Sequence, residues 1–188
     1  MSYTVTPTFI DIFKIGDNII YNIGILDKLY EQYNTDPSSR QYIRKIIVVT
    51  NASIAEALLF DFIRNRVQHA NFTEQILLHI PAIFSVKLSK FQHYIAQARK
   101  HNLFNSTDAF YDALELLAKK RNRIHIQNDK FEEPRDEMSV FDENAKILSE
   151  KVIEQVCNVL MSKYPRRAEY HGYVGDFVFP WDAHLVAP

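Results

Sequence analysis

Arginine, asparagine and histidine lie close together in the segment "LELLAKKRNRIHIQND", at Arg121, Asn122 and His125. Histidine titrates near neutrality and can transfer protons, whereas arginine keeps its charge and matches phosphate geometry with paired donors. Asparagine can orient an imidazole or bind a phosphate. These residue types fit RNA cleavage without a metal, in which a base removes the 2′-hydroxyl proton and an acid protonates the leaving oxygen. A cation must also stabilise the charge on the phosphate.

Helical periodicity places Arg121 and His125 on the apolar side of their segment. With Phe110 set to zero and about 100° per residue, Leu114 falls near +40°, Arg121 near +20° and His125 near +60°. Ile124 falls at about −40° on the same scale and is expected to be buried. The spacing therefore predicts that Arg121 continues the apolar stripe, that His125 lies beside it, and that both meet another helix or subunit.

Glu56 is the best candidate partner for Arg121. It interrupts "NASIAEALLFDFIRNR", which is otherwise apolar almost all round. A half-buried guanidinium needs a carboxylate or several carbonyl oxygens as partners, and a carboxylate in such a helix needs a positive group. Two interpretations stay open. The pair fixes the packing of two helices, or it belongs to a site in which His125 and Asn122 also act.

Periodic apolar residues predict a chain made almost entirely of helices. The run Ile46–Val49 alone would suit a strand, but no turn signal separates it from the helical pattern that follows. Ser106 or Thr107 is expected to cap one helix and Asp142 another, and strand signals are nearly absent. The expected helices cover residues 9–33, 41–69, 73–79, 84–101, 108–126 and 143–164, with a turn at 34–40, a break at Pro81 and a polar connector between the last two.

The predicted fold class is therefore an all-α bundle of about five or six helices with an irregular aromatic C-terminal tail. The helical domain is expected over residues 1–164. The tail, residues 165–188, gains glycine, proline and aromatic residues and loses the helical period. It is expected to form a short hairpin, or an arm that lies on the domain or on a partner.

Composition limits the classes of protein to which the chain can belong. Of 188 residues, 47% are apolar, and 22 basic residues face 23 acidic ones for a net charge of −1, so binding to nucleic acid requires a local basic patch. The chain lacks any stretch near the roughly 20 apolar residues that span a bilayer. A single cysteine and an N-terminus unlike a signal peptide predict a soluble cytoplasmic protein. Histidine spacing and glycine content predict no metal site and no cofactor.

The segments "NASIAEALLF", "KLSKFQHYIAQARKHNLFNSTDAFYDALELL" and "LAKKRNRIHIQND" together resemble the HEPN family, the higher eukaryote and prokaryote nucleotide-binding domains. These are all-α bundles in which one helix carries an Arg-Asn…His motif and an earlier helix supplies a polar or acidic residue. Arg121, Asn122 and His125 match the motif, and Glu56 matches the earlier position. Three residues separate Arg121 from His125, a shorter gap than is usual in the family.

The resemblance implies a metal-independent endoribonuclease, often a toxin or antiviral defence effector, that works as a homodimer with a composite site. Arg121, Asn122, His125 and Glu56 would then be the catalytic set, with RNA as substrate and an antitoxin as a further partner. The alternative that the resemblance implies is a non-catalytic binding module, such as the partner of a nucleotidyltransferase.

Overall fold

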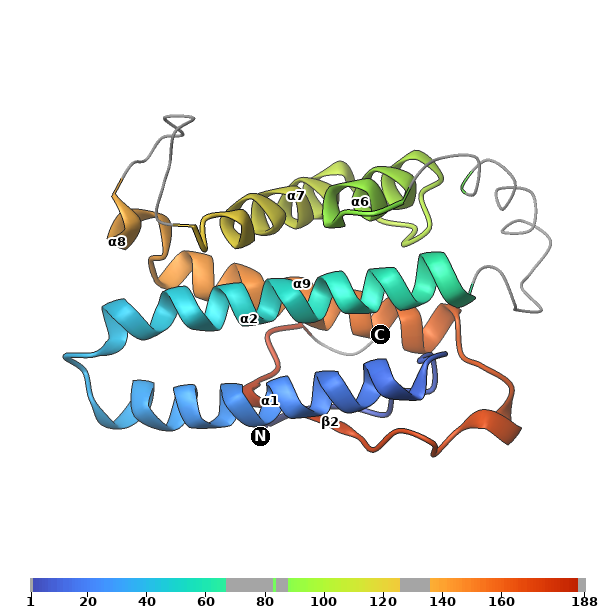
Figure 1. Cartoon of the computed structure of the whole chain (residues 1–188), viewed down its shortest axis with the longest axis horizontal. Helices are drawn as coiled ribbons and strands as arrows, with labels where there is room; N and C mark the ends of the chain where they lie inside the picture. Colours follow the sequence, from blue (N-terminus) through green and yellow to red (C-terminus); the bar gives the residue numbers. More distant parts are fainter. Residues whose placement is uncertain (1, 67–82, 84–87, 126–135, 186–188) are drawn as a thin grey trace.

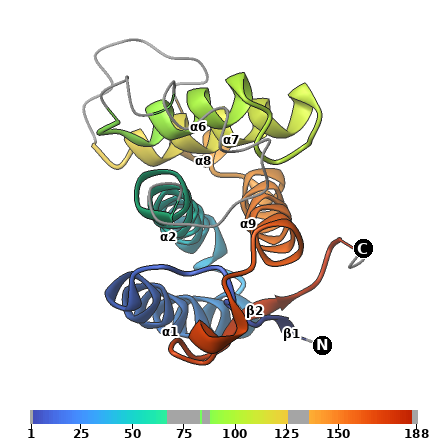
Figure 2. The same ribbon diagram turned by 90° about the vertical axis from the view of Figure 1, so that its right-hand side faces the viewer.

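The most apolar segment of the chain forms the central helix, α2 (Arg40–Phe60). The computed structural model describes residues 2–66, 83, 88–125 and 136–185, which are arranged in three layers (Figures 1 and 2). Helices α2 and α9 (Glu143–Lys163) form the middle layer, α1 (Phe13–Thr35) covers one side, and α6 (Phe91–Lys100) and α7 (Asp108–Asn122) cover the other. The structure confirms the predicted all-α bundle, with one small sheet added.

Helix α2 is buried on most of its circumference. Ile47, Val48, Ala52 and Leu59 are all 0% exposed, and the helix contacts α1, α6, α7 and α9. The Ile46–Val49 run is helical, as predicted. The segment Arg40–Arg64 is long and apolar enough to cross a membrane, but most of it is buried inside the bundle. Burial of this kind is typical of the core helix of a soluble protein.

The first helix begins four residues later than its apolar pattern predicts. Phe9 and Ile10 are buried although they precede α1, because the chain here runs across one end of the bundle. The Asp61 carboxylate accepts hydrogen bonds from the backbone amides of Asp11 and Ile12, at 2.8 and 3.0 Å. Asp61 lies in the π-helical turn Asp61–Arg66 that continues α2, so a distant side chain decides where α1 starts.

Other helix boundaries also differ from the prediction. Residues 88–90 are not helical and α6 begins at Phe91, whereas α7 ends at Asn122 rather than at residue 126. The predicted connector contains a short helix, α8 (Glu137–Val140), which the Asp136 side chain caps by accepting a hydrogen bond from the Ser139 amide. The helix predicted over 73–79 and the break at Pro81 lie outside the described residues.

Strand β1 (Ser2–Val5) pairs antiparallel with β2 (Phe177–Asp182). The sequence did not predict β1. Because β2 pairs with β1, the tail is an arm that lies on the domain. Phe177 and Phe179 are fully buried and Trp181 is 6% exposed, so the alternate aromatic residues of β2 pack inward. A three-residue helical turn, η2 (Ala168–Tyr170), lies between α9 and β2.

The start of α9 joins three helical segments through charged groups. Asp142 caps the helix by accepting a hydrogen bond from the Ala145 amide, as predicted. Glu143 accepts a hydrogen bond from the Tyr33 hydroxyl, lies 3.0 Å from Lys146 Nζ, and lies 3.8 Å from Arg44 Nη1. These contacts tie α1 and α2 to the N-terminal end of α9.

A matched pair of substitutions in α2 tests the orientation of this helix. Ile47→Ala should lower the free energy of unfolding by about 2–5 kcal/mol, because Ile47 is completely buried and its truncation leaves a cavity. Ile46→Ala should change it by less than about 0.5 kcal/mol at protein concentrations low enough to keep the chain monomeric, because Ile46 is 50% exposed in the single chain. Urea unfolding measures both values, and equal losses would contradict the described face of α2.

Glu143 should give the protein part of its stability against acid. Burial raises the pKa of this carboxyl, but hydrogen bonds from Tyr33 and Lys146 outweigh burial and hold the pKa below its ordinary value of 4.5. The ionised form therefore stabilises the fold. This contribution is complete above 4.5 and is lost as the pH falls through the lower pKa of the folded state.

Glu143→Gln removes this contribution. Urea unfolding at neutral pH should show the variant to be less stable than wild type, and the difference should shrink at pH values well below 4.5. A difference that is independent of pH would show that the ionised carboxylate contributes nothing.

Candidate active site at the α2–α7 contact

The ion pair predicted between Arg121 and Glu56 is present. Arg121 Nη2, on the last turn of α7, lies 2.8 Å from Glu56 Oε2 on α2. The Glu56 side chain is 22% exposed and that of Arg121 is 40% exposed. Arg121 thus faces α2 as the apolar stripe of α7 requires, and its guanidinium still reaches solvent. A half-exposed guanidinium beside a carboxylate can bind a phosphate with its remaining donors.

His125 does not share a helical face with Arg121. Because α7 ends at Asn122, residues 123–125 form a turn and a bend, and the predicted helical register stops before the histidine. Asn122 and His125 are both exposed. Ile124, which the helical projection expects to be buried, is 56% exposed. The histidine therefore lies beyond the helix end that carries the ion pair, and its side chain is open to solvent.

Contacts with α8 fix the end of α7. Lys120 Nζ donates a hydrogen bond to the Val140 carbonyl oxygen, and burial lowers the pKa of the Lys120 ammonium. Arg123 Nε lies 3.3 Å from Glu137 Oε1, and the other carboxylate oxygen of Glu137 lies 2.5 Å from Lys45 Nζ on α2. Glu137 therefore links Lys45 on α2 to Arg123, the residue just after α7.

The Tyr94 phenol is influenced by both Arg64 and Glu56. Burial raises the pKa of the Tyr94 phenol, a hydrogen bond from Arg64 opposes this rise, and the charge of Glu56 adds to it. Arg64 Nη1 also donates a hydrogen bond to the Leu88 carbonyl oxygen at 2.6 Å. Tyr94 is 4% exposed and its ring packs edge-on against Phe60. Sequence reasoning missed Tyr94, although its position on the apolar face of α6 predicts that it points toward α2.

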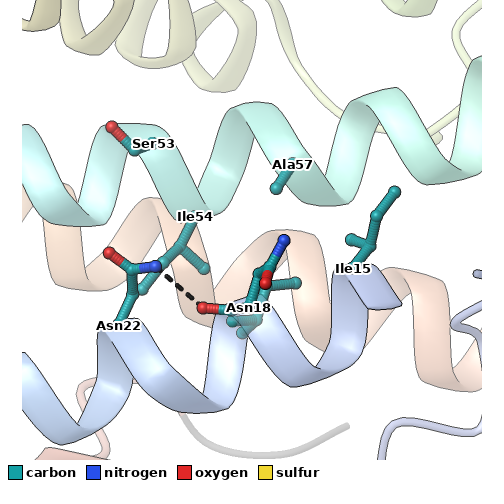
Figure 3. Close-up of a pocket in the computed structure, with 7 residues that line it drawn as sticks. Ile15, Asn18, Asn22, Ser53, Ile54 and Ala57 are labelled. Carbon is teal, nitrogen blue, oxygen red and sulfur yellow. Dashed lines mark hydrogen bonds between the residues drawn. The ribbon is translucent and has the colours of Figure 1, made fainter. Parts of the chain in front are cut away.

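Glu56 borders a solvent-facing stripe of α2. About 100° per residue places Tyr42, Ile46 and Ser53 within roughly 40° of one another, with Glu56 about 40° beyond Tyr42. Tyr42 is 68% exposed and Ile46 is 50% exposed. Ser53, in the middle of this arc, and Ala57, beyond its other edge, line a groove against α1, where Asn22 Nδ2 donates a hydrogen bond to the Asn18 carbonyl oxygen (Figure 3).

Asn51, which precedes Glu56 in the same segment, does not join the site. Its side-chain nitrogen donates a hydrogen bond to Ser149 Oγ on α9, on the opposite side of α2. Ser53 Oγ donates to the Val49 carbonyl oxygen. Within the part of the chain that the structure describes, no three His, Cys, Asp or Glu side chains gather closely enough to hold a metal ion.

The chain was compared with families, with curated proteins and with solved structures. No family model, no curated protein and no solved structure matches it.

A double-mutant cycle tests the ion pair. Glu56→Ala, Arg121→Ala and the double variant should give a coupling free energy of about 0.5–1 kcal/mol, because both partners are partly exposed to solvent. The coupling should fall as salt is added, since salt screens partly exposed charges. Thermal or urea unfolding measures it, and additive single effects at low salt would contradict a direct pair.

Proposed function

We propose that this protein is a HEPN-like, metal-independent endoribonuclease that acts in the cytoplasm as a toxin or an antiviral defence effector. The observation that carries the proposal is the Arg121–Glu56 pair, in which a carboxylate orients the guanidinium and the Arg121 side chain is 40% exposed. Asn122 and His125 follow on the same segment and are exposed, so cation, amide and imidazole are all accessible to a substrate.

Each residue has a chemical role in this proposal. Arg121 neutralises the phosphate as the 2′-hydroxyl attacks phosphorus, and Glu56 holds the guanidinium in place. His125 transfers a proton, either from the 2′-hydroxyl or to the leaving 5′-oxygen. Asn122 contacts the phosphate or the imidazole. The P–O5′ bond breaks as the P–O2′ bond forms, so the products carry a 2′,3′-cyclic phosphate and a 5′-hydroxyl.

One histidine supplies one of the two proton transfers, so the proposal includes a homodimer whose second copy supplies the other. The α2 stripe supports this arrangement because it exposes Tyr42 and Ile46 on the same helix that carries Glu56. A two-fold contact through the stripe buries these side chains and brings the two Arg121–Glu56 pairs toward a common groove. RNA then binds across the two copies.

A non-catalytic interaction module is the second candidate. The end of α7 at Asn122 favours it, because His125 lies outside the helical register that would hold it beside Arg121. In this case the ion pair stabilises the packing of α2 on α7, and the exposed stripe binds a partner protein such as an antitoxin or a nucleotidyltransferase. The two candidates predict different effects of His125→Ala on RNA cleavage.

Cleavage of mixed RNA in the presence of a chelator separates the two functions. Under the proposal, wild type cleaves and leaves 2′,3′-cyclic phosphate ends. His125→Ala should reduce the rate about 10²–10⁴-fold, the usual contribution of a general acid or base. Arg121→Ala should reduce it by about 10²-fold or more, because a group that stabilises developing charge is lost.

His171→Ala and Arg167→Ala are matched controls, since both residues are exposed and lie in the C-terminal arm. Both should cleave at the wild-type rate. If wild type leaves RNA intact, or if His125→Ala cleaves as fast as wild type, the endoribonuclease proposal fails. A lower melting temperature of Arg121→Ala without any RNA cleavage by wild type would support the interaction module.

A further inference from the structure

The C-terminal arm is held by a buried carboxylate on α9. Glu154 is 0% exposed and accepts hydrogen bonds from Trp181 Nε1 at 3.0 Å and from the His184 amide at 3.0 Å. The Leu185 amide donates to the second carboxylate oxygen at 2.8 Å. Three N–H donors from the arm thus surround one carboxylate that is buried away from water. A buried carboxylate needs such donors to compensate for its lost hydration.

A second buried carboxylate, one helical turn earlier, extends this contact. Glu150 has a side chain that is 1% exposed, and one of its oxygens lies 2.6 Å from His184 Nε2. The other oxygen lies 2.9 Å from Lys146 Nζ and accepts a hydrogen bond from the Tyr30 hydroxyl. The end of the arm therefore contacts two buried acids, and through Glu150 it is connected to α1.

Strand β1 is held by contacts with α9 and with β2. The Tyr3 hydroxyl donates to Asn158 Oδ1 at 2.9 Å, and its ring stacks on Phe179 with centroids 5.6 Å apart. All four residues of β1 pair with β2. A two-stranded sheet of this length is marginally stable by itself, so side-chain contacts must supply most of what holds it on the bundle.

The linker between α9 and β2 is anchored at its beginning. The Arg166 amide donates to the Thr8 carbonyl oxygen at 2.8 Å, and Arg166 Nη1 donates to the Ile10 carbonyl oxygen at 2.9 Å. From residue 167 to residue 173 every side chain is exposed, and Gly172 has a φ of 82°, which favours glycine. The arm is thus attached near Arg166 and again from Phe177 onward.

We infer that β1 and residues 177–185 form a latch, held by Glu154 and Glu150, that opens as one unit while the helices stay folded. A partly open latch leaves a buried carboxylate without donors, which costs more than opening completely and hydrating it. Because all four residues of β1 pair with β2, the two strands leave the bundle together. Full opening also exposes Phe177, Phe179 and Trp181, which the closed latch buries. The latch is a conformational switch that is separate from the Arg121–Glu56 site and independent of the proposed function.

Trp181 is the only tryptophan of the chain and reports on the latch directly. In Glu154→Gln the side chain keeps its size but places an amide N–H₂ where the arm offers only donors. We expect the Trp181 emission to shift to longer wavelength and to become quenchable by acrylamide, while helical circular dichroism stays at the wild-type value. Glu169→Gln, which removes an exposed carboxylate of the same arm, should leave both signals unchanged.

Urea unfolding of the wild-type protein gives a second readout that needs no variant. The fluorescence transition of Trp181 should occur at lower urea than the loss of helical circular dichroism. Coincident transitions would overturn the inference, because arm and bundle would then unfold together. Unchanged Trp181 emission in Glu154→Gln would overturn it as well, and so would loss of the helices in that variant.

Discussion

The burial of α2 is the constraint on which the rest of the structure depends. This helix contacts α1, α6, α7 and α9, and its side chains Ile47, Val48 and Ala52 have no exposed surface. A helix packed on so many sides leaves one narrow stripe toward solvent. Glu56 lies at the border of that stripe, where a carboxylate can meet Arg121 from α7 and keep partial contact with water. The position of the candidate site therefore follows from the packing of the core helix.

The charged groups at the α2–α7 contact and those under the arm differ in exposure. At the α2–α7 contact the charged groups are partly exposed, so their desolvation costs little free energy and they remain available to a ligand. Under the arm, Glu150 and Glu154 are almost completely buried and bonded to fixed donors, so their charges hold structure in place. The partly exposed Arg121–Glu56 pair is thus suited to binding phosphate. The buried carboxylates of Glu150 and Glu154 are suited to holding β2 on the core.

The sequence predicted the fold class and the Arg121–Glu56 pair, because a lone charge in an apolar stripe needs a partner. It did not predict the end of α7, since no glycine or proline stands directly after Asn122 and the helix end contacts α8 through Lys120 and Arg123. Strand β1 was missed because it is four residues long and pairs with a strand at the far end of the chain. The sequence analysis did not single out Glu154, since its donors come from the irregular tail.

The proposed composite site makes one geometric demand, which is that two copies of His125 and Arg121 converge on one phosphate. A structure of the protein bound to RNA, with a 2′-deoxy nucleotide at the cleaved position to prevent attack, measures this most directly. The expected result is a two-fold dimer across the α2 stripe with both His125 side chains facing the scissile phosphate and Arg121 contacting its oxygens. A monomer, or a dimer in which the two His125 side chains lie far apart and away from the RNA, would contradict the proposed site.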